Sequence, residues 1–145
     1  MVSMTILDAN ILIYSTNTDD PSYGPINSWL KQLFEGPETV GFPWVALWAY
    51  LRLSTDPRIW KRPKTPAGAL SDVRAWLNQP GAALIHPGPR HADLLEDLLI
   101  KHHVVGPFVS DAALAALAIE NGATLASTDR DFRRFKGLRW VNPLD

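Results

Sequence analysis

Residues 4–14, MTILDANILIY, contain the feature that decides the fold. Residues 4–7 form a short apolar run that ends at Asp8, a pattern typical of a buried strand with a carboxylate at its carboxyl end. Residues 10–14 then predict the first turns of a helix, for which Asp8 or Asn10 is a suitable cap. A strand that leads directly into a helix indicates an α/β domain, in which the two kinds of element alternate.

The rest of the chain continues this alternation. Helices are predicted where apolar residues recur at three- and four-residue spacing, and strands where short apolar runs stand between turn residues. The predicted strands cover 39–42, 82–86, 123–126 and 138–141; the predicted helices cover 23–35, 43–55, 66–78, 91–102 and 111–121, with a helical turn at 131–135. We therefore expect one α/β domain over residues 1–145, with a mostly parallel sheet.

The composition excludes several classes of protein. The chain is 46% hydrophobic and 20% charged, so it has enough apolar surface to bury a core. The 14 basic and 15 acidic residues give a net charge of -1, which excludes a uniformly basic coat for nucleic acid. The absence of cysteine excludes disulfides and thiolate metal sites. No apolar run approaches the roughly 20 residues of a membrane span, and we expect no signal peptide and a cytoplasmic location.

Three aspartates occupy related positions at predicted strand ends and helix starts. Asp8 ends the first strand, Asp111 starts an alanine-rich helix, and Asp129 follows the strand at 123–126. Because open parallel sheets form their sites at the carboxyl ends of strands, we expect these side chains to lie together. Clustered carboxylates repel one another unless a cation such as Mg²⁺ or Mn²⁺ neutralises them. Taken singly, each acid is also explained as a helix cap or as a surface ion-pair partner.

Three segments resemble motifs of the PIN-domain nucleases. ILDANIL at 6–12 resembles their first motif, SDAALAALA at 110–118 their third-acid helix, and LASTDRDF at 125–132 their fourth motif. The ending, FKGLRW at 135–140 with Pro-Leu at 143–144, is similar to the VapC-type toxins of bacterial toxin–antitoxin pairs. The resemblance covers almost the whole chain, and three motifs in this order make it fairly specific.

The resemblance implies a three-layer, Rossmann-like α/β/α domain that cleaves RNA with bound Mg²⁺ or Mn²⁺. It assigns Asp8, Asp111 and Asp129 as the catalytic, metal-binding acids, with Asp131 as an auxiliary group. It also implies a VapB-type antitoxin that holds the toxin inactive, and a homodimer. The expected reaction is metal-assisted hydrolysis of an RNA phosphodiester bond, which leaves a 5′-phosphate and a 3′-hydroxyl.

The chain departs from the family pattern at the second acid. That acid is usually a glutamate on the helix after the second strand, and Ala49 occupies its place here. Three interpretations follow: three acids suffice, or Asp56, Glu96 or Glu120 substitutes, or the domain binds RNA or a partner without cutting. A phosphatase for small phosphates is a weaker alternative, because the chain has no glycine-rich phosphate loop.

Positive charge is concentrated in two stretches, although the net charge is near zero. Residues 52–74 and 130–139 are both rich in arginine and lysine, and we expect them to hold a phosphate backbone on either side of the acids. Within the first stretch, Trp60 is either a platform for an unpaired base or a packed aromatic. The apolar helix that contains Trp44 and Trp48 is a candidate surface for a dimer or antitoxin contact.

Overall fold

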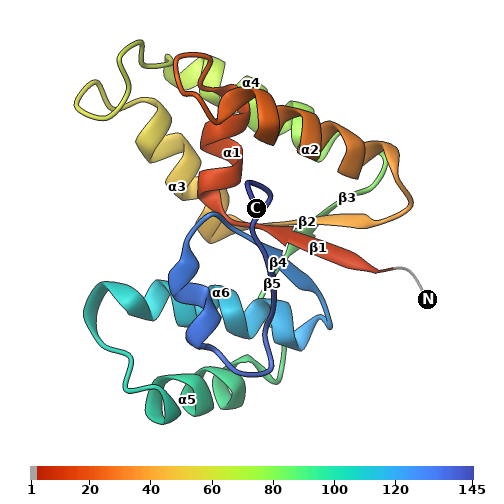
Figure 1. The fold of residues 1–145 in the computed structure, drawn as a ribbon, viewed down its shortest axis with the longest axis vertical. Coiled ribbons are helices and arrows are strands. Elements are labelled where there is room, and N and C mark those ends of the chain that lie inside the picture. The colour runs from red at the N-terminus through yellow and green to blue at the C-terminus, as the bar shows by residue number, and fades with distance from the viewer. Residues whose placement is uncertain (1–2) are drawn as a thin grey trace.

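The computed structural model describes residues 3–145 and contains one five-stranded sheet (Figure 1). The strands are β1 (Met4–Leu7), β2 (Thr39–Pro43), β3 (Ala82–Ile85), β4 (Thr124–Ala126) and β5 (Arg139–Val141). They lie in the order β3-β2-β1-β4-β5, and each neighbouring pair is parallel. The prediction of an α/β fold with a mostly parallel sheet is confirmed.

The helices divide between the two faces of the sheet. One face is covered by α1 (Ala9–Thr16), α2 (Tyr23–Glu35), α3 (Trp44–Ser54) and α4 (Pro66–Leu77), and the other by α5 (His91–Lys101) and α6 (Val109–Glu120) (Figure 1). The short 3-10 helix η1 (Gly106–Phe108) precedes α6, and a second one, η2 (Arg130–Arg134), follows β4. This is the three-layer α/β/α arrangement that the resemblance implies. Among residues 3–145, no helix is both long enough and apolar enough to span a bilayer.

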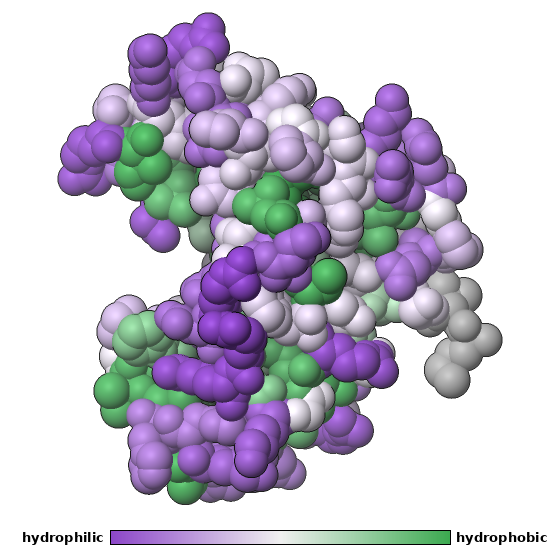
Figure 2. All heavy atoms as spheres, in the orientation of Figure 1, coloured by the Kyte–Doolittle hydropathy of each residue, from purple (hydrophilic) through white to green (hydrophobic). Residues whose placement is uncertain are grey.

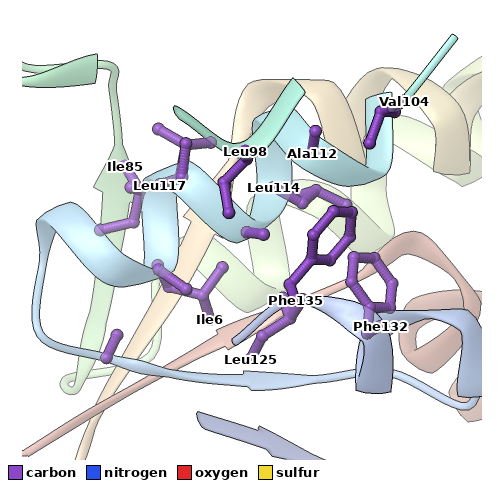
Figure 3. Packing of buried hydrophobic residues seen from close by; sticks show 14 residues of the cluster. Ile6, Ile85, Leu98, Val104, Ala112, Leu114, Leu117, Leu125, Phe132 and Phe135 are labelled. Atoms are coloured by element: carbon purple, nitrogen blue, oxygen red, sulfur yellow. The ribbon is translucent and has the colours of Figure 1, made fainter. Parts of the chain in front are cut away.

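Each face of the sheet has its own apolar core. Under α5 and α6, Ile6 of β1 belongs to a cluster that also contains Phe132 and Phe135, and both rings lie close to α6 (Figure 3). On the other face, Leu7 packs under α1–α4 with residues such as Phe42. Successive residues of a strand point to opposite faces, so β1 is buried on both sides. This double burial explains why β1 is a continuous apolar run rather than an alternating one.

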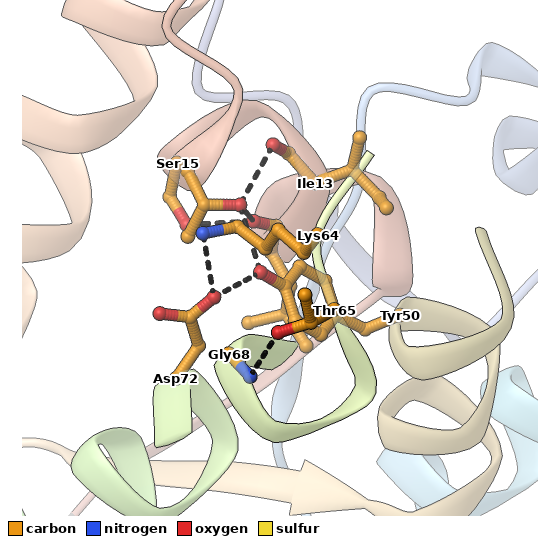
Figure 4. A network of polar contacts seen from close by, with 9 residues as sticks. Ile13, Ser15, Tyr50, Lys64, Thr65, Gly68 and Asp72 are labelled. Atoms are coloured by element: carbon orange, nitrogen blue, oxygen red, sulfur yellow. Dashed lines mark hydrogen bonds and ion pairs between the residues drawn. The ribbon is translucent and has the colours of Figure 1, made fainter. Parts of the chain in front are cut away.

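A polar network connects α3 to α1, to α4 and to the loop before α4 (Figure 4). The phenol of Tyr50 on α3 donates to Asp72 Oδ2 of α4 at 2.6 Å, and its oxygen lies 3.0 Å from Thr16 Oγ1 of α1. From the loop before α4, Lys64 Nζ pairs with Asp72 Oδ2 at 3.0 Å. Burial, followed by the bond to Asp72, raises the pKa of Tyr50 above its usual range, so the phenol stays protonated. The network holds α3 between α1 and α4 and thereby orients its opposite face.

The loop between α3 and α4 turns Trp60 into the protein. The backbone N–H groups of Ile59 and Trp60 both donate to the carbonyl of Asp56 at 3.0 Å, which makes a tight turn. Only 4% of Trp60 is exposed. The interpretation of Trp60 as a packed aromatic is confirmed and its role as a base platform is wrong, because the ring has no free face.

Candidate functional site

The strand order reverses at β1, and this reversal locates the site. β2 and β3 lie on one side of β1, whereas β4 and β5 lie on the other. In open parallel sheets, ligands bind at the carboxyl edge where the order reverses. At this edge β1 leads into Asp8, β2 leads into α3, and β4 leads into the segment that contains Asp129.

Asp8 both caps α1 and faces the site. Its Oδ1 accepts the Ala9 N–H at 2.7 Å, and its Oδ2 accepts the Ser127 hydroxyl at 2.7 Å. Burial raises the pKa of Asp8 above its ordinary value, these two hydrogen bonds lower it, and the charge of Asp129 raises it again. The capping and site interpretations are therefore compatible, since only one oxygen is used for the cap.

Ser127 connects the two acidic segments. Besides donating to Asp8, its hydroxyl accepts the N–H of Asp129 at 3.1 Å and an Nδ2–H of Asn10 at 3.0 Å. Asp129 in turn caps η2, because its Oδ1 accepts the N–H of Asp131 at 2.9 Å. The side chain of Asp131 itself is exposed. Ser127 and Asn10 are positioning residues. Asn10 was predicted only as an alternative cap of the first helix, which Asp8 provides, and no role was predicted for Ser127, although both lie inside the quoted motifs.

Asp111 lies in the first turn of α6, on the opposite wall of the site from α3. Burial, then the charges of Asp129 and Asp8, raise its pKa from 3.8 to about 6, while Arg134 acts in the opposite direction. Carboxylates affect each other's pKa strongly only when they are close and incompletely solvated. Asp8, Asp111 and Asp129 therefore form one electrostatic site, although they come from distant parts of the sequence.

A cavity of about 530 Å³ lies between α3 and the start of α6. It corresponds to the hollow between the two halves of the molecule in Figure 2. Asp8 and Asp111 both line it. The α3 wall is a stripe at three- and four-residue spacing, as expected for one helix face, made of Val45, Trp48, Ala49 and Arg52. Position 49 thus faces the acids directly, and alanine adds no carboxylate there.

The acids considered as substitutes for the missing glutamate lie elsewhere. Asp56 pairs with Arg58 at 2.9 Å in the loop after α3. Glu120 accepts two backbone N–H groups of the loop before α5, at 2.8 and 2.9 Å. Glu96 lies on α5, beside a different hollow. None of them lines the cavity of Asp8 and Asp111, and none is among the charges that raise the pKa of those two acids, which argues against the alternative that one of them replaces the second acid.

The donor set of the site suits a hard divalent cation. Within residues 3–145, no group of three or more His, Cys, Asp or Glu side chains is already arranged to hold a metal ion. Asp129 is engaged in capping η2, whereas Asp8 and Asp111 face the cavity. Burial is the main cause of the raised pKa of Asp8 and of Asp111, and the charges of neighbouring carboxylates add to both rises. These carboxylates nevertheless supply the oxygen donors that a hard cation prefers. Binding of Mg²⁺ or Mn²⁺ relieves the repulsion among these charges, so the residues present fit these ions.

Comparisons with known proteins agree with this fold. The PIN domain family model matches residues 5–138. Ribonuclease VapC37 of Mycobacterium tuberculosis is 42% identical over 140 residues, which cover 97% of each chain. Ribonuclease VapC33 of the same species is 37% identical over 141 residues, which cover 97% of this chain and 99% of the relative. The chain belongs to the PIN-domain family, and its relatives within that family are named as VapC ribonucleases.

Solved structures share the fold at lower sequence identity. A chain of Rickettsia felis VapBC2 bound to a promoter DNA fragment superposes with a TM-score of 0.72 at 18% identity, over 96% of this chain and 98% of that one. M. tuberculosis VapC20, described as a sarcin–ricin loop cleaving toxin, superposes with a TM-score of 0.63 at 16% identity, over 93% and 98%. These similarities confirm the PIN-like α/β architecture.

Proposed function

We propose that the chain is a metal-dependent endoribonuclease that acts as the toxin of a type II toxin–antitoxin pair. The observation that carries the proposal is the convergence of Asp8 and Asp111 on one cavity, with the charge of Asp129 acting on both. The full-length similarity to the VapC ribonucleases supports the reaction class. In this proposal Asp8, Asp111 and Asp129 hold the ion.

A bound Mg²⁺ or Mn²⁺ would supply Lewis acidity, which polarises a phosphodiester and makes water a better nucleophile. The chain's own residues prepare the site for it. Ser127 and the Ala9 N–H fix the two oxygens of Asp8 before any substrate arrives. Asp111, with a pKa of about 6, is ionised at neutral pH and is available to bind a cation. The substrate strand enters the open side of the cavity between α3 and α6.

The alanine at position 49 leaves two candidate functions, cleavage of RNA and binding without cleavage. If three acids suffice, the chain cleaves RNA without the family's second glutamate. The second candidate is a domain that binds RNA or a partner without cutting, and Ala49 on the cavity wall is the observation that favours it. We favour cleavage, because Asp8 and Asp111 still line one cavity, where buried carboxylates with like-charged neighbours favour a bound cation.

An antitoxin of the VapB type is the proposed protein partner. Trp48 is 63% exposed beside the acids and stacks on Trp44, with ring centroids 6.2 Å apart. An exposed indole at the rim of a site is suited to being covered by another chain. An antitoxin segment seated there would block access to Asp8 and Asp111. We also propose that the chain forms a homodimer. Because its proposed substrate is RNA, we propose that it acts in the cytoplasm.

Sequencing of RNA ends tests the function. The purified chain is incubated with total RNA and Mg²⁺, and the new ends are mapped. We expect discrete cuts that carry 5′-phosphates and that disappear with EDTA or with Asp8→Asn or Asp111→Asn. Asp97→Asn, which changes an exposed acid on α5, is the matched control and retains cleavage. Cleavage that survives EDTA or either site substitution would overturn the proposal, and a complete lack of cuts by the unaltered chain would favour the binding-only alternative.

A further inference from the structure

Contacts within the chain divide the basic residues of 52–74 and 130–139 into two groups. The first group is neutralised locally: Arg58 pairs with Asp56, Arg62 with Asp19, Lys64 with Asp72 and Arg130 with Asp145, while Arg139 donates to the carbonyl of Gly122. The second group forms no ion pair among residues 3–145. Two of its members are close to the acids. Arg52 lines the cavity of Asp8 and Asp111, and Arg134 stacks on Phe108 just before α6 and acts on the charge of Asp111.

Arg52 projects from α3 into the wall of the cavity. It follows Ala49 by three residues, so the two lie on the same helix face, and both line the space that Asp8 and Asp111 share. The side chain of Arg52 is exposed and makes no ion pair within residues 3–145. Arg58 and, more weakly, the charge of Arg52 lower the pKa of Asp56, but Asp56 is paired with Arg58. The guanidinium of Arg52 is therefore free to bind an anion that enters the cavity.

Arg134 is held in place by aromatic rings instead of by a carboxylate. Its guanidinium carbon lies 5.2 Å from the ring centroid of Phe108 and 5.0 Å from that of Phe135. Phe135 is fixed in the core against α6 (Figure 3). Stacking on rings restrains a guanidinium but leaves its N–H donors free for an anion. Arg134 is also near enough to Asp111 to act on it electrostatically.

The two arginines flank the acids along the edge of the sheet. Asp8 follows the central strand β1, whereas Arg52 belongs to the connection after β2 and Arg134 to the connection after β4. Arg52 therefore comes from one side of β1 in the strand order and Arg134 from the other. Guanidinium groups match phosphate oxygens in pairs, so two arginines on opposite sides of the acids are suited to hold one nucleic-acid strand.

We propose that Arg52 and Arg134 bind the RNA phosphates on the two sides of the linkage that lies at the acids. This inference rests on the proposed function for its substrate class. It names two substrate-positioning residues, and it explains how an RNA strand is held across three carboxylates. Arg52 then provides an anion contact on the α3 wall, one helical turn after Ala49.

The test measures RNA binding independently of cleavage. All proteins carry Asp8→Asn, and the probe is a fluorescein-labelled, single-stranded RNA of mixed sequence, titrated at several salt concentrations. One phosphate contact on a single strand contributes about 0.7 to the slope of log Kd against log salt. Arg52→Gln and Arg134→Gln should each lower the slope by about 0.7. If the contact contributes nothing at 1 M salt, a slope of 0.7 means that it strengthens binding about fivefold at 0.1 M salt. Each substitution should therefore weaken binding about fivefold at 0.1 M salt.

Arg74→Gln is the matched control, since Arg74 is an exposed arginine of the first stretch, on α4 and outside the cavity. We expect its slope to equal that of the parent, and we expect all variants to melt at the parent's temperature. Slopes for Arg52→Gln and Arg134→Gln that equal the control's would overturn the proposal, as would an equal loss in all three. Because cleavage is not measured, a failure of the proposed nuclease activity is seen separately, in the RNA-end experiment.

Discussion

The carboxylate of Asp111 is expected to destabilise the metal-free protein at neutral pH. Burial and the charges of Asp129 and Asp8 raise its pKa from 3.8 to about 6. The folded chain thus binds this proton more tightly than the unfolded chain, so stability rises as the pH falls from above 6 towards 4. Asp111→Asn removes the charge at every pH with almost no change in shape. We therefore expect this variant to be more stable than the parent at pH 8, even though it loses activity.

The size of the effect follows from the pKa shift. A shift from 3.8 to about 6 corresponds to about 3 kcal/mol at ~1.36 kcal/mol per pH unit. Asp111 borders an open cavity, and water there screens its charge, so we expect about 1 kcal/mol to remain. For a chain of 145 residues this is a rise of about 3 °C in Tm.

Thermal unfolding followed by circular dichroism, in EDTA, measures this difference. Asp111→Asn should melt about 3 °C above the parent at pH 8 and at the same temperature near pH 4, where the parent's carboxyl is protonated. Asp97→Asn, which removes an exposed charge far from the cavity, should stay within about 0.5 kcal/mol of the parent at both pH values. If Asp111→Asn is no more stable than this control at pH 8, the carboxylates are not crowded and the reasoning is refuted.

Three further substitutions test other parts of the site. Ser127→Ala removes a hydrogen bond that lowers the pKa of Asp8. On the acid side of the pH–rate profile, RNA cleavage should therefore be lost at a higher pH than in the parent. An unchanged profile would show that this bond is unimportant. Tyr50→Phe leaves the carboxylate of Asp72 without its 2.6 Å donor, and urea unfolding should show a loss of about 1–3 kcal/mol, whereas a neutral result would argue against the network in Figure 4. Ala49→Glu places a carboxylate on the cavity wall. It should tighten Mn²⁺ binding about tenfold in calorimetry and lower the Tm of the metal-free chain at pH 8; unaltered affinity would mean that position 49 does not reach the ion.

The parallel sheet and the region of the site were predictable because local sequence encodes them. A strand buried on both faces must be continuously apolar, as in β1, and the first polar residue after it must leave the sheet at its carboxyl edge. Asp8 was therefore predictable without knowledge of contacts, and Asp129 was predictable as the first acid after β4. The alanine-rich sequence of α6 likewise predicted a helix, and Asp111 lies in its first turn.

The remaining features depend on contacts between distant segments, which periodicity does not reveal. The hydroxyl of Ser127 bridges Asp8 and the Asp129 backbone across 119 positions of sequence, and no local pattern distinguishes it from a surface serine. Trp60 is buried because a turn at Asp56 redirects the chain. Similarly, the sequence shows where the basic residues are concentrated but not which of them are available to bind a ligand. Only the structure shows which arginines already have carboxylate partners.

In the proposed nuclease, acids from three segments of the chain share one divalent ion. Crystals grown with Mn²⁺ and measured near the manganese absorption edge test it most directly, since the anomalous difference map locates the ion without assumptions. We predict a peak in the cavity between α3 and α6, within about 2.5 Å of carboxylate oxygens of Asp8 and Asp111 and reached by Asp129 directly or through water. A map with no peak among these side chains, at a Mn²⁺ concentration that supports RNA cleavage, would contradict the account.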